Sequence, residues 1–150
     1  MMHQNTILLV EDNTDDEELT RLAFEESGIV NHLDIVRDGA EALDYIFAIG
    51  AWAGRPGGNP SLILLDLKLP KIGGLEVLRQ LRADPRTELT PVVILTSSVE
   101  EQDLLRGYKL GCNSYIRKPV DFTRLAEIMR LLGLYWLTIN EPPLAAGGAR

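Results

Sequence analysis

The sequence has one cysteine, no long apolar run and no cluster of basic residues, and each shortage disfavours a class of proteins. Cys112 alone excludes an intramolecular disulfide framework, so we expect a reducing, cytoplasmic location. No apolar stretch approaches the roughly 20 residues of a membrane-spanning helix, so no membrane partner is expected. The net charge of −7, without a basic stripe, argues against direct binding to nucleic acid.

Short apolar runs alternate along the chain with segments of helical periodicity. The length of 150 residues fits one domain with a full-sized core. The alternation predicts an α/β fold with a parallel sheet and helices on both faces. The expected strands are 6–10, 33–37, 61–66, 91–96 and 113–117, and the expected helices are 14–27, 39–50, 74–83, 99–108 and 121–138.

Polar residues stand at the ends of four of the expected strands. Glu11 and Asp12 follow the first strand, and Asp66 ends the apolar run of the third. Thr96 ends the fourth and Lys118 follows the fifth. In open α/β sheets, ligands bind beyond the carboxyl ends of the strands. The sequence therefore predicts a site at this edge of the sheet.

The residue types at this edge suit phosphoryl transfer. A carboxylate such as Asp66 can attack a phosphoryl group and form an acyl phosphate. The attack needs positive charge near the phosphoryl oxygens, which a metal ion and a lysine can supply. Oxygen ligands of this kind suit Mg²⁺. No cluster of cysteine and histidine residues is present for a transition metal.

Taken together, these strand-end residues resemble the receiver domain of two-component response regulators. The likeness covers about residues 5–138. It implies a flavodoxin-like, doubly wound, five-stranded parallel sheet in the order 2-1-3-4-5. It also implies a signalling protein that takes a phosphoryl group from a sensor histidine kinase, rather than an enzyme that turns over a substrate.

The resemblance assigns a role to each residue of the motif. Asp66 is the implied phosphoacceptor. The implied Mg²⁺ ligands are Glu11, Asp12, Asp66 and the backbone carbonyl of Lys68. The implied contacts of the phosphoryl group are Thr96 and Lys118, the implied aromatic switch is Tyr115, and the implied cis peptide precedes Pro119. Tyr115 is also compatible with a plain core position.

Two segments depart from a bare receiver. Residues 50–61 form a long connection rich in glycine and proline, and residues 133–150 form an apolar C-terminal extension. Both resemble the single-domain regulators that pair with bacterial and cyanobacterial phytochromes, which form homodimers. The resemblance implies a dimer interface through the C-terminal helix and extension, at Leu134, Tyr135, Trp136 and Leu137.

Several alternatives stay open on the sequence alone. A receiver fold with vestigial phosphorylation would be a constitutive binding module. A phosphatase with an aspartate nucleophile is less favoured, because it needs a second acid where Lys68 stands. Trp52 is either a local hydrophobic plug or a partner contact. The acids that follow Asp12 are expected to serve only the helix dipole: Asp15, Asp16, Glu17 and Glu18.

Overall fold

The structure is a computed structural model that describes residues 6–28, 32–56, 58–118 and 121–143. Its five strands form one parallel sheet in the order β2-β1-β3-β4-β5. The strands are β1 (Thr6–Val10), β2 (His32–Val36), β3 (Leu62–Leu65), β4 (Val92–Thr96) and β5 (Ser114–Arg117). The predicted fold class and strand order are therefore confirmed.

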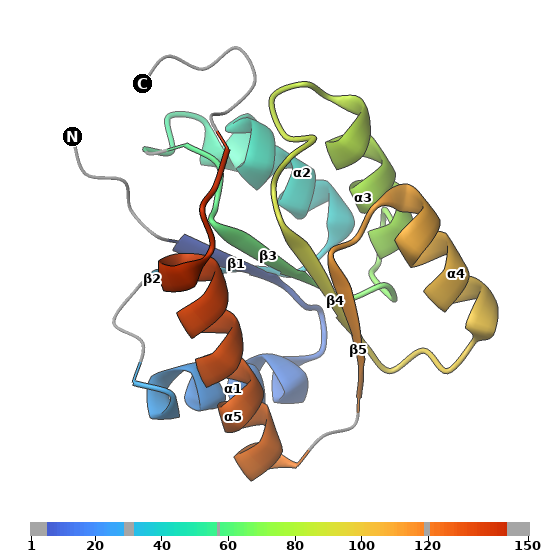
Figure 1. Cartoon of the computed structure of the whole chain (residues 1–150). Helices are drawn as coiled ribbons and strands as arrows, with labels where there is room; N and C mark the ends of the chain where they lie inside the picture. The colour runs from blue at the N-terminus through green and yellow to red at the C-terminus, as the bar shows by residue number, and fades with distance from the viewer. Residues whose placement is uncertain (1–5, 29–31, 57, 119–120, 144–150) are drawn as a thin grey trace.

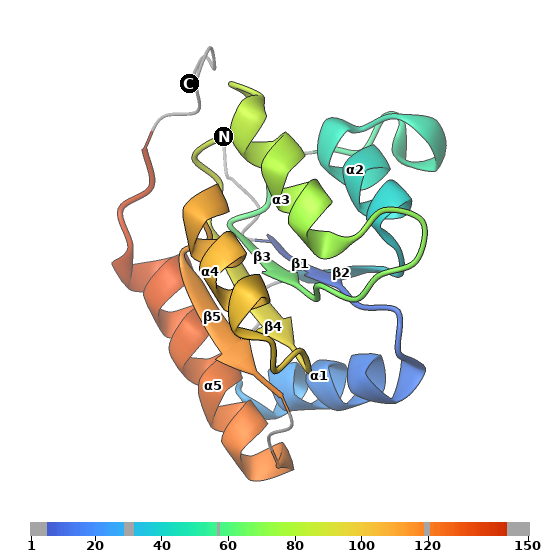
Figure 2. The ribbon, with the colours of Figure 1, turned by 90° about the vertical axis from the view of Figure 1, so that its right-hand side faces the viewer.

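Helices cover both faces of the sheet (Figures 1 and 2). One face carries α1 (Thr14–Glu26) and α5 (Phe122–Leu134). The other carries α2 (Gly39–Phe47), α3 (Gly74–Ala83) and α4 (Glu101–Leu110). The central strands consequently have no solvent-facing side, which explains why they read as continuous apolar runs.

Alternate residues of each central strand enter two separate hydrophobic clusters. In β1, Leu8 and Val10 pack with α2 and α3, whereas Ile7 and Leu9 pack with α1 and α5. This division follows from the two-residue period of a strand. The side chains of both clusters are buried and packed against the sheet. The sheet is therefore a rigid base for the residues at its carboxyl edge.

The largest differences from the predicted helix boundaries lie in the second, fourth and last helices. The second helix was expected to reach residue 50, but it ends at Phe47 because Ala48 adopts a left-handed backbone with φ of 53°. The fourth was expected over 99–108 but spans Glu101–Leu110, and Gly111 with φ of 99° follows its end. The last was expected to reach 138, but a π-helical turn, Tyr135–Ile139, follows α5 instead.

The long connection after α2 folds back onto that helix. A short 3-10 turn, Gly50–Trp52, brings Trp52 edge-on to Tyr45 with 4.8 Å between ring centroids. Its indole nitrogen donates to Glu41 at 3.3 Å, and its ring packs against the first hydrophobic cluster. Trp52 therefore acts as a local hydrophobic plug.

Helix α4 is held differently from its neighbours. Gly107 is its one buried residue, and a Cβ atom there would lie 2.9 Å from Ile94. Leu105 and Tyr108 are more than half exposed. The helix thus lies close to the sheet through its backbone, with few side chains inserted into the core.

Among the residues that the structure describes, no helix combines the length and apolar character needed to cross a membrane.

Candidate functional site

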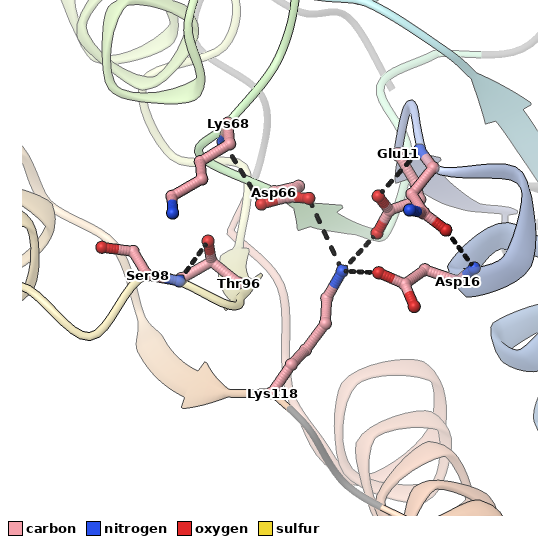
Figure 3. Close-up of polar contacts among 8 residues, drawn as sticks. Glu11, Asp16, Asp66, Lys68, Thr96, Ser98 and Lys118 are labelled. Carbon is pink, nitrogen blue, oxygen red and sulfur yellow. Dashed lines mark hydrogen bonds and ion pairs between the residues drawn. The ribbon is translucent and has the colours of Figure 1, made fainter.

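Parallel pairing brings the predicted residues together at one edge of the sheet (Figure 3). Val10 lies opposite Leu65 in the register, so Glu11 and Asp66 follow on neighbouring strands. The Asp66 amide donates to the carbonyl of Val10 at 3.1 Å. The Lys118 amide donates to the carbonyl of Thr96 at 2.7 Å, which fixes the end of β5 beside that of β4.

Three carboxylates can converge on one cation here. Glu11, Asp12 and Asp66 each offer an oxygen, and these oxygens lie within 4.8 Å of one another. Glu11 and Asp66 are buried and Asp12 is exposed. Hard oxygen ligands with one side open to water suit a divalent cation that retains some of its water. The donor set therefore fits a divalent metal ion.

Lys68 lies in the turn directly after Asp66. Its amide donates to Oδ1 of Asp66 at 3.3 Å, so its backbone is held against that carboxylate. The Lys68 side chain extends on the side of Asp66 that faces Thr96 and Ser98 (Figure 3). An ammonium group is thereby available near this side of the site.

The Lys118 ammonium is the positive charge that lies among the carboxylates of the site. Its ammonium nitrogen lies 2.6 Å from Glu11, 2.9 Å from Asp16 and 3.5 Å from Asp66. Burial would lower the pKa of Lys118, but its hydrogen bonds to Glu11 and Asp16 outweigh this and raise the pKa. Lys118 therefore stays charged.

Glu11 has an unusual proton affinity for a carboxylate. Burial raises its pKa to about 7, because the ionised form is poorly solvated, and the bond to Lys118 opposes this only in part. A bound divalent cation would favour the ionised form. A metal ion held by Glu11 would therefore compete with a proton for this carboxylate.

Thr96 and Ser98 connect the site to α4. Thr96 is fully buried, and its hydroxyl accepts a hydrogen bond from the amide of Ser98 at 3.3 Å. The Ser98 hydroxyl donates to Asp103 in the first turn of α4 at 2.6 Å. A displacement of Thr96 thus has a direct polar route to this helix.

Tyr115 is partly buried at the edge of the core, beside this route. Its ring packs against the first hydrophobic cluster and stacks on Tyr108 with 6.4 Å between centroids. Burial raises the pKa of its phenol, and the hydroxyl has no hydrogen-bond partner among the described residues. The core interpretation of Tyr115 is supported, and its role as a switch stays a prediction.

The remaining predicted residues are placed unevenly. Pro119, and with it the predicted cis peptide, lies outside the described residues. In the C-terminal segment, Leu134 and Tyr135 are 46% and 47% exposed. Trp136 and Leu137 instead pack against the second hydrophobic cluster of the chain itself.

Sequence reasoning missed the contact between Asp16 and Lys118. The acids of α1 were expected to serve only the helix dipole, but Asp16 forms a direct ion pair at 2.9 Å. The available signal was its place in the first turn of the helix that directly follows Glu11 and Asp12 in the chain. The hydrogen bond between Ser98 and Asp103 was missed as well, because neither residue belongs to a recognisable sequence motif.

Comparison with known proteins decides the family. The model of the response regulator receiver domain matches residues 7–130. The chain belongs to the response regulator receiver family. Receivers of this family work with sensor histidine kinases, and this receiver has relatives that are associated with phytochromes.

Two curated relatives match most of this receiver. The probable methanogenesis regulatory protein FilR2 of Methanothrix harundinacea is 42% identical over 91% of this chain and 86% of its own. The response regulator Rcp1 of Synechocystis is 37% identical over 93% of both chains. Rcp1 has also been solved in a Mn²⁺-bound form, with a TM-score of 0.82 to this receiver, 36% identity and coverage of 93% and 99%.

Two further solved structures connect this receiver with phytochromes. The phosphorylated cyanobacterial phytochrome response regulator RcpA has a TM-score of 0.84 and 38% identity, covering 95% of this chain and 99% of its own. The bacteriophytochrome response regulator RtBRR has a TM-score of 0.78 and 49% identity, covering 97% and 87%. The predicted resemblance to this group is confirmed.

Proposed function

We propose that the receiver accepts a phosphoryl group on Asp66 from a sensor histidine kinase. The observation that carries this proposal is the position of Asp66. Its side chain is 7% exposed, lies 3.5 Å from the Lys118 ammonium and adjoins the acids Glu11 and Asp12. A buried carboxylate between a cation-binding cluster and a lysine is arranged for attack on a charged electrophile.

The proposed reaction is a simple displacement at phosphorus. An Asp66 carboxylate oxygen donates an electron pair to phosphorus, and a new O–P bond forms. The bond between phosphorus and the donor breaks, and its electron pair leaves with the donor, a histidine nitrogen in the kinase. Lys118 lies close enough to balance the charge of the transferred group.

The proposed metal ion is Mg²⁺, held by Glu11, Asp12, Asp66 and the carbonyl of Lys68. The clustered oxygens of the three carboxylates and the Mn²⁺-bound form of Rcp1 support a divalent ion at this position. When bound, Mg²⁺ supplies positive charge to the phosphoryl oxygens. The protein residues fix the carboxylates on rigid strand ends, so little reorganisation is needed.

The proposed signal is a change of surface that begins at Thr96. Its hydroxyl would turn towards the phosphoryl oxygens, and the Ser98 bond to Asp103 would carry the movement to α4. Tyr115, packed between the sheet and α4, would adjust to the new position. This is a local electrostatic change that biases a two-state surface.

The proposed kinase is of the phytochrome type. The support is the likeness to RcpA, a cyanobacterial phytochrome response regulator, and to RtBRR, a bacteriophytochrome response regulator. We propose that residues 1–150 act as one receiver domain with the extension 133–150. We also propose that it signals through a protein–protein contact or a phosphorelay. A cytoplasmic location fits the buried free thiol of Cys112.

We further propose a homodimer through the C-terminal segment. The most exposed of its large apolar side chains have exposed fractions between 46% and 61%: Leu131, Leu134, Tyr135 and Ile139. Clustered apolar side chains on one segment are typical of an interaction surface. Because Trp136 and Leu137 contact the core of the same chain, the proposed interface centres on Leu134 and Tyr135.

The test is the intact mass after incubation with acetyl phosphate, with and without Mg²⁺. Wild-type protein should gain one phosphoryl group only with Mg²⁺, and Asp66→Asn should gain none because it lacks the nucleophile. Asp15→Asn changes an exposed acid and should behave as wild type. A wild type that stays unmodified with both acetyl phosphate and candidate kinases would contradict the proposal.

A further inference from the structure

Lys118 is shared among three carboxylates, and the closest ones are not the phosphoacceptor. An ammonium group has three N–H donors. Glu11 at 2.6 Å and Asp16 at 2.9 Å are within hydrogen-bond distance of Lys118, whereas Asp66 at 3.5 Å is beyond it. The lysine is thus drawn towards the start of α1 and away from Asp66.

The position of Asp16 is fixed by the first turn of α1. Asn13 caps this helix, and its side chain accepts a hydrogen bond from the amide of Asp16 at 2.9 Å. The Asp16 side chain then points at the ammonium of Lys118, on a different side from Asp66 (Figure 3). The Lys118 side chain is 11% exposed and that of Asp16 is 37% exposed. The pair therefore lies at the rim of the site.

Glu11 and Asp16 differ in what happens to them when the site is filled. Glu11 is one of the oxygens that converge on the divalent ion, so its bond to Lys118 and its bond to the metal compete. Asp16 is not part of that cluster. Among the described residues, Asp16 is the partner of Lys118 with no second role at the site.

We infer that Asp16 is a positioning residue that holds Lys118 back from Asp66 and so limits how readily the site takes up a phosphoryl group. This inference rests on the proposed phosphorylation of Asp66. To bond to a phosphoryl oxygen, Lys118 has to weaken its contact with Asp16. The negative charge of Asp16 also repels an incoming phosphoryl donor. The hold on Lys118 and the repulsion of the donor both slow phosphorylation of Asp66.

The test compares three variants in two measurements. Asp16→Asn removes the charge and keeps the side-chain size, and Asp16→Glu keeps the charge. Asp15→Asn removes the same charge from an exposed neighbour that is not among the described partners of Lys118. The measurements are the rate of phosphorylation by acetyl phosphate, followed by intact mass, and the affinity for beryllium trifluoride with Mg²⁺, measured by calorimetry.

Asp16→Asn should raise both the rate and the affinity by about two- to five-fold, the range that corresponds to losing a partly exposed ion pair. Asp15→Asn should change both much less, because only the long-range charge differs. Asp16→Glu should stay close to wild type. Thermal unfolding of each variant separates a local effect from a loss of fold.

Two results would overturn the inference. Equal effects of Asp16→Asn and Asp15→Asn would assign the change to net charge alone. A slower or weaker Asp16→Asn would show that Asp16 helps Lys118 rather than holding it back. Both outcomes leave the proposed function intact, whereas a wild type that takes up neither phosphoryl group nor beryllium trifluoride would contradict the proposed function itself.

Discussion

Gly74 controls how closely α3 approaches the backbone of the phosphoacceptor. A Cβ atom at Gly74 would lie 2.2 Å from the carbonyl oxygen of Asp66 and 2.7 Å from Cα of Leu67. Both are backbone atoms, so no side chain can move aside. The absence of a side chain at this position therefore helps to fix the orientation of Asp66.

We predict that Gly74→Ala lowers the free energy of unfolding by about 1–3 kcal/mol, as overpacking typically does. It should also slow phosphorylation, because the shift falls on the residue that carries the nucleophile. Urea unfolding and the acetyl phosphate assay measure the two effects. Gly58→Ala is the control, since a Cβ atom there has nothing within 4 Å. Equal behaviour of the two variants would contradict the prediction.

Among the helices and connections, Arg55 binds the last carbonyls of α2 and anchors the long connection to that helix. The guanidinium donates to the carbonyls of Tyr45 at 2.8 Å and Ile46 at 3.3 Å. The last carbonyls of a helix lack their usual partners within the helix. The Tyr45 carbonyl also accepts a bond from the amide of Ala48 at 3.2 Å, so the guanidinium adds a second bond there and a bond to Ile46. The same guanidinium bonds to Gly58 at 3.0 Å and lies 4.2 Å from the ring centre of Tyr45.

We predict that Arg55→Ala lowers the free energy of unfolding by about 1–3 kcal/mol, from the lost hydrogen bonds and cation–π contact. Cleavage within residues 50–61 by a protease should become faster, because the connection loses its anchor. Limited proteolysis followed by mass spectrometry measures this. Arg130→Ala, at an exposed site on α5, should change neither quantity. Unchanged cleavage in Arg55→Ala would mean that Trp52 alone holds the connection.

The elements also show what the sequence predicts well. Apolar runs such as that of β3 are typical of strands buried on both faces, and the alternation of such runs with helical segments predicted the five strands. Their order was implied by the resemblance to receiver domains, and it is confirmed. The end of α2 was missed because Ala48 has no intrinsic preference for a left-handed backbone. That conformation accompanies the packing of the connection onto Tyr45, a tertiary contact that local sequence does not encode.

The candidate site divides in the same way. Glu11, Asp66, Thr96 and Lys118 were predicted because strand ends must meet at one edge of a parallel sheet. The partner of Lys118 on α1 was not predicted, since it depends on the rotation of that helix about its axis. Helix rotation is set by packing against α5 and the sheet, which single-sequence periodicity describes only coarsely.

At the scale of the whole molecule, charge and apolar surface oppose each other in self-association. Each copy carries a net charge of −7, so two copies repel at low ionic strength. The exposed side chains of Leu131, Leu134, Tyr135 and Ile139 favour association. Because salt screens charge but not apolar burial, the proposed dimer should become stronger as salt is added.

We predict that a double variant, Leu134→Glu with Tyr135→Glu, converts the dimer to a monomer without unfolding it. Both side chains are nearly half exposed, so charges there meet water in the monomer but are buried in the dimer. Light scattering at 50 and 300 mM salt measures the mass. A control with the same added charge is Ile49→Glu with Leu89→Glu, at two other exposed positions. A wild type that is monomeric at both salt concentrations would contradict the proposed interface.

Helix α4 contributes fewer buried side chains to the core than its neighbour α3. Helix α3 inserts Val77, Leu78 and Leu81 into the core, so moving it would open cavities. Helix α4 buries only Gly107 and is tied by the Ser98–Asp103 and Arg117–Glu101 contacts. Exchanging one polar contact for another leaves the core volume unchanged. We therefore expect that α4 can shift with less disturbance of the core than α3.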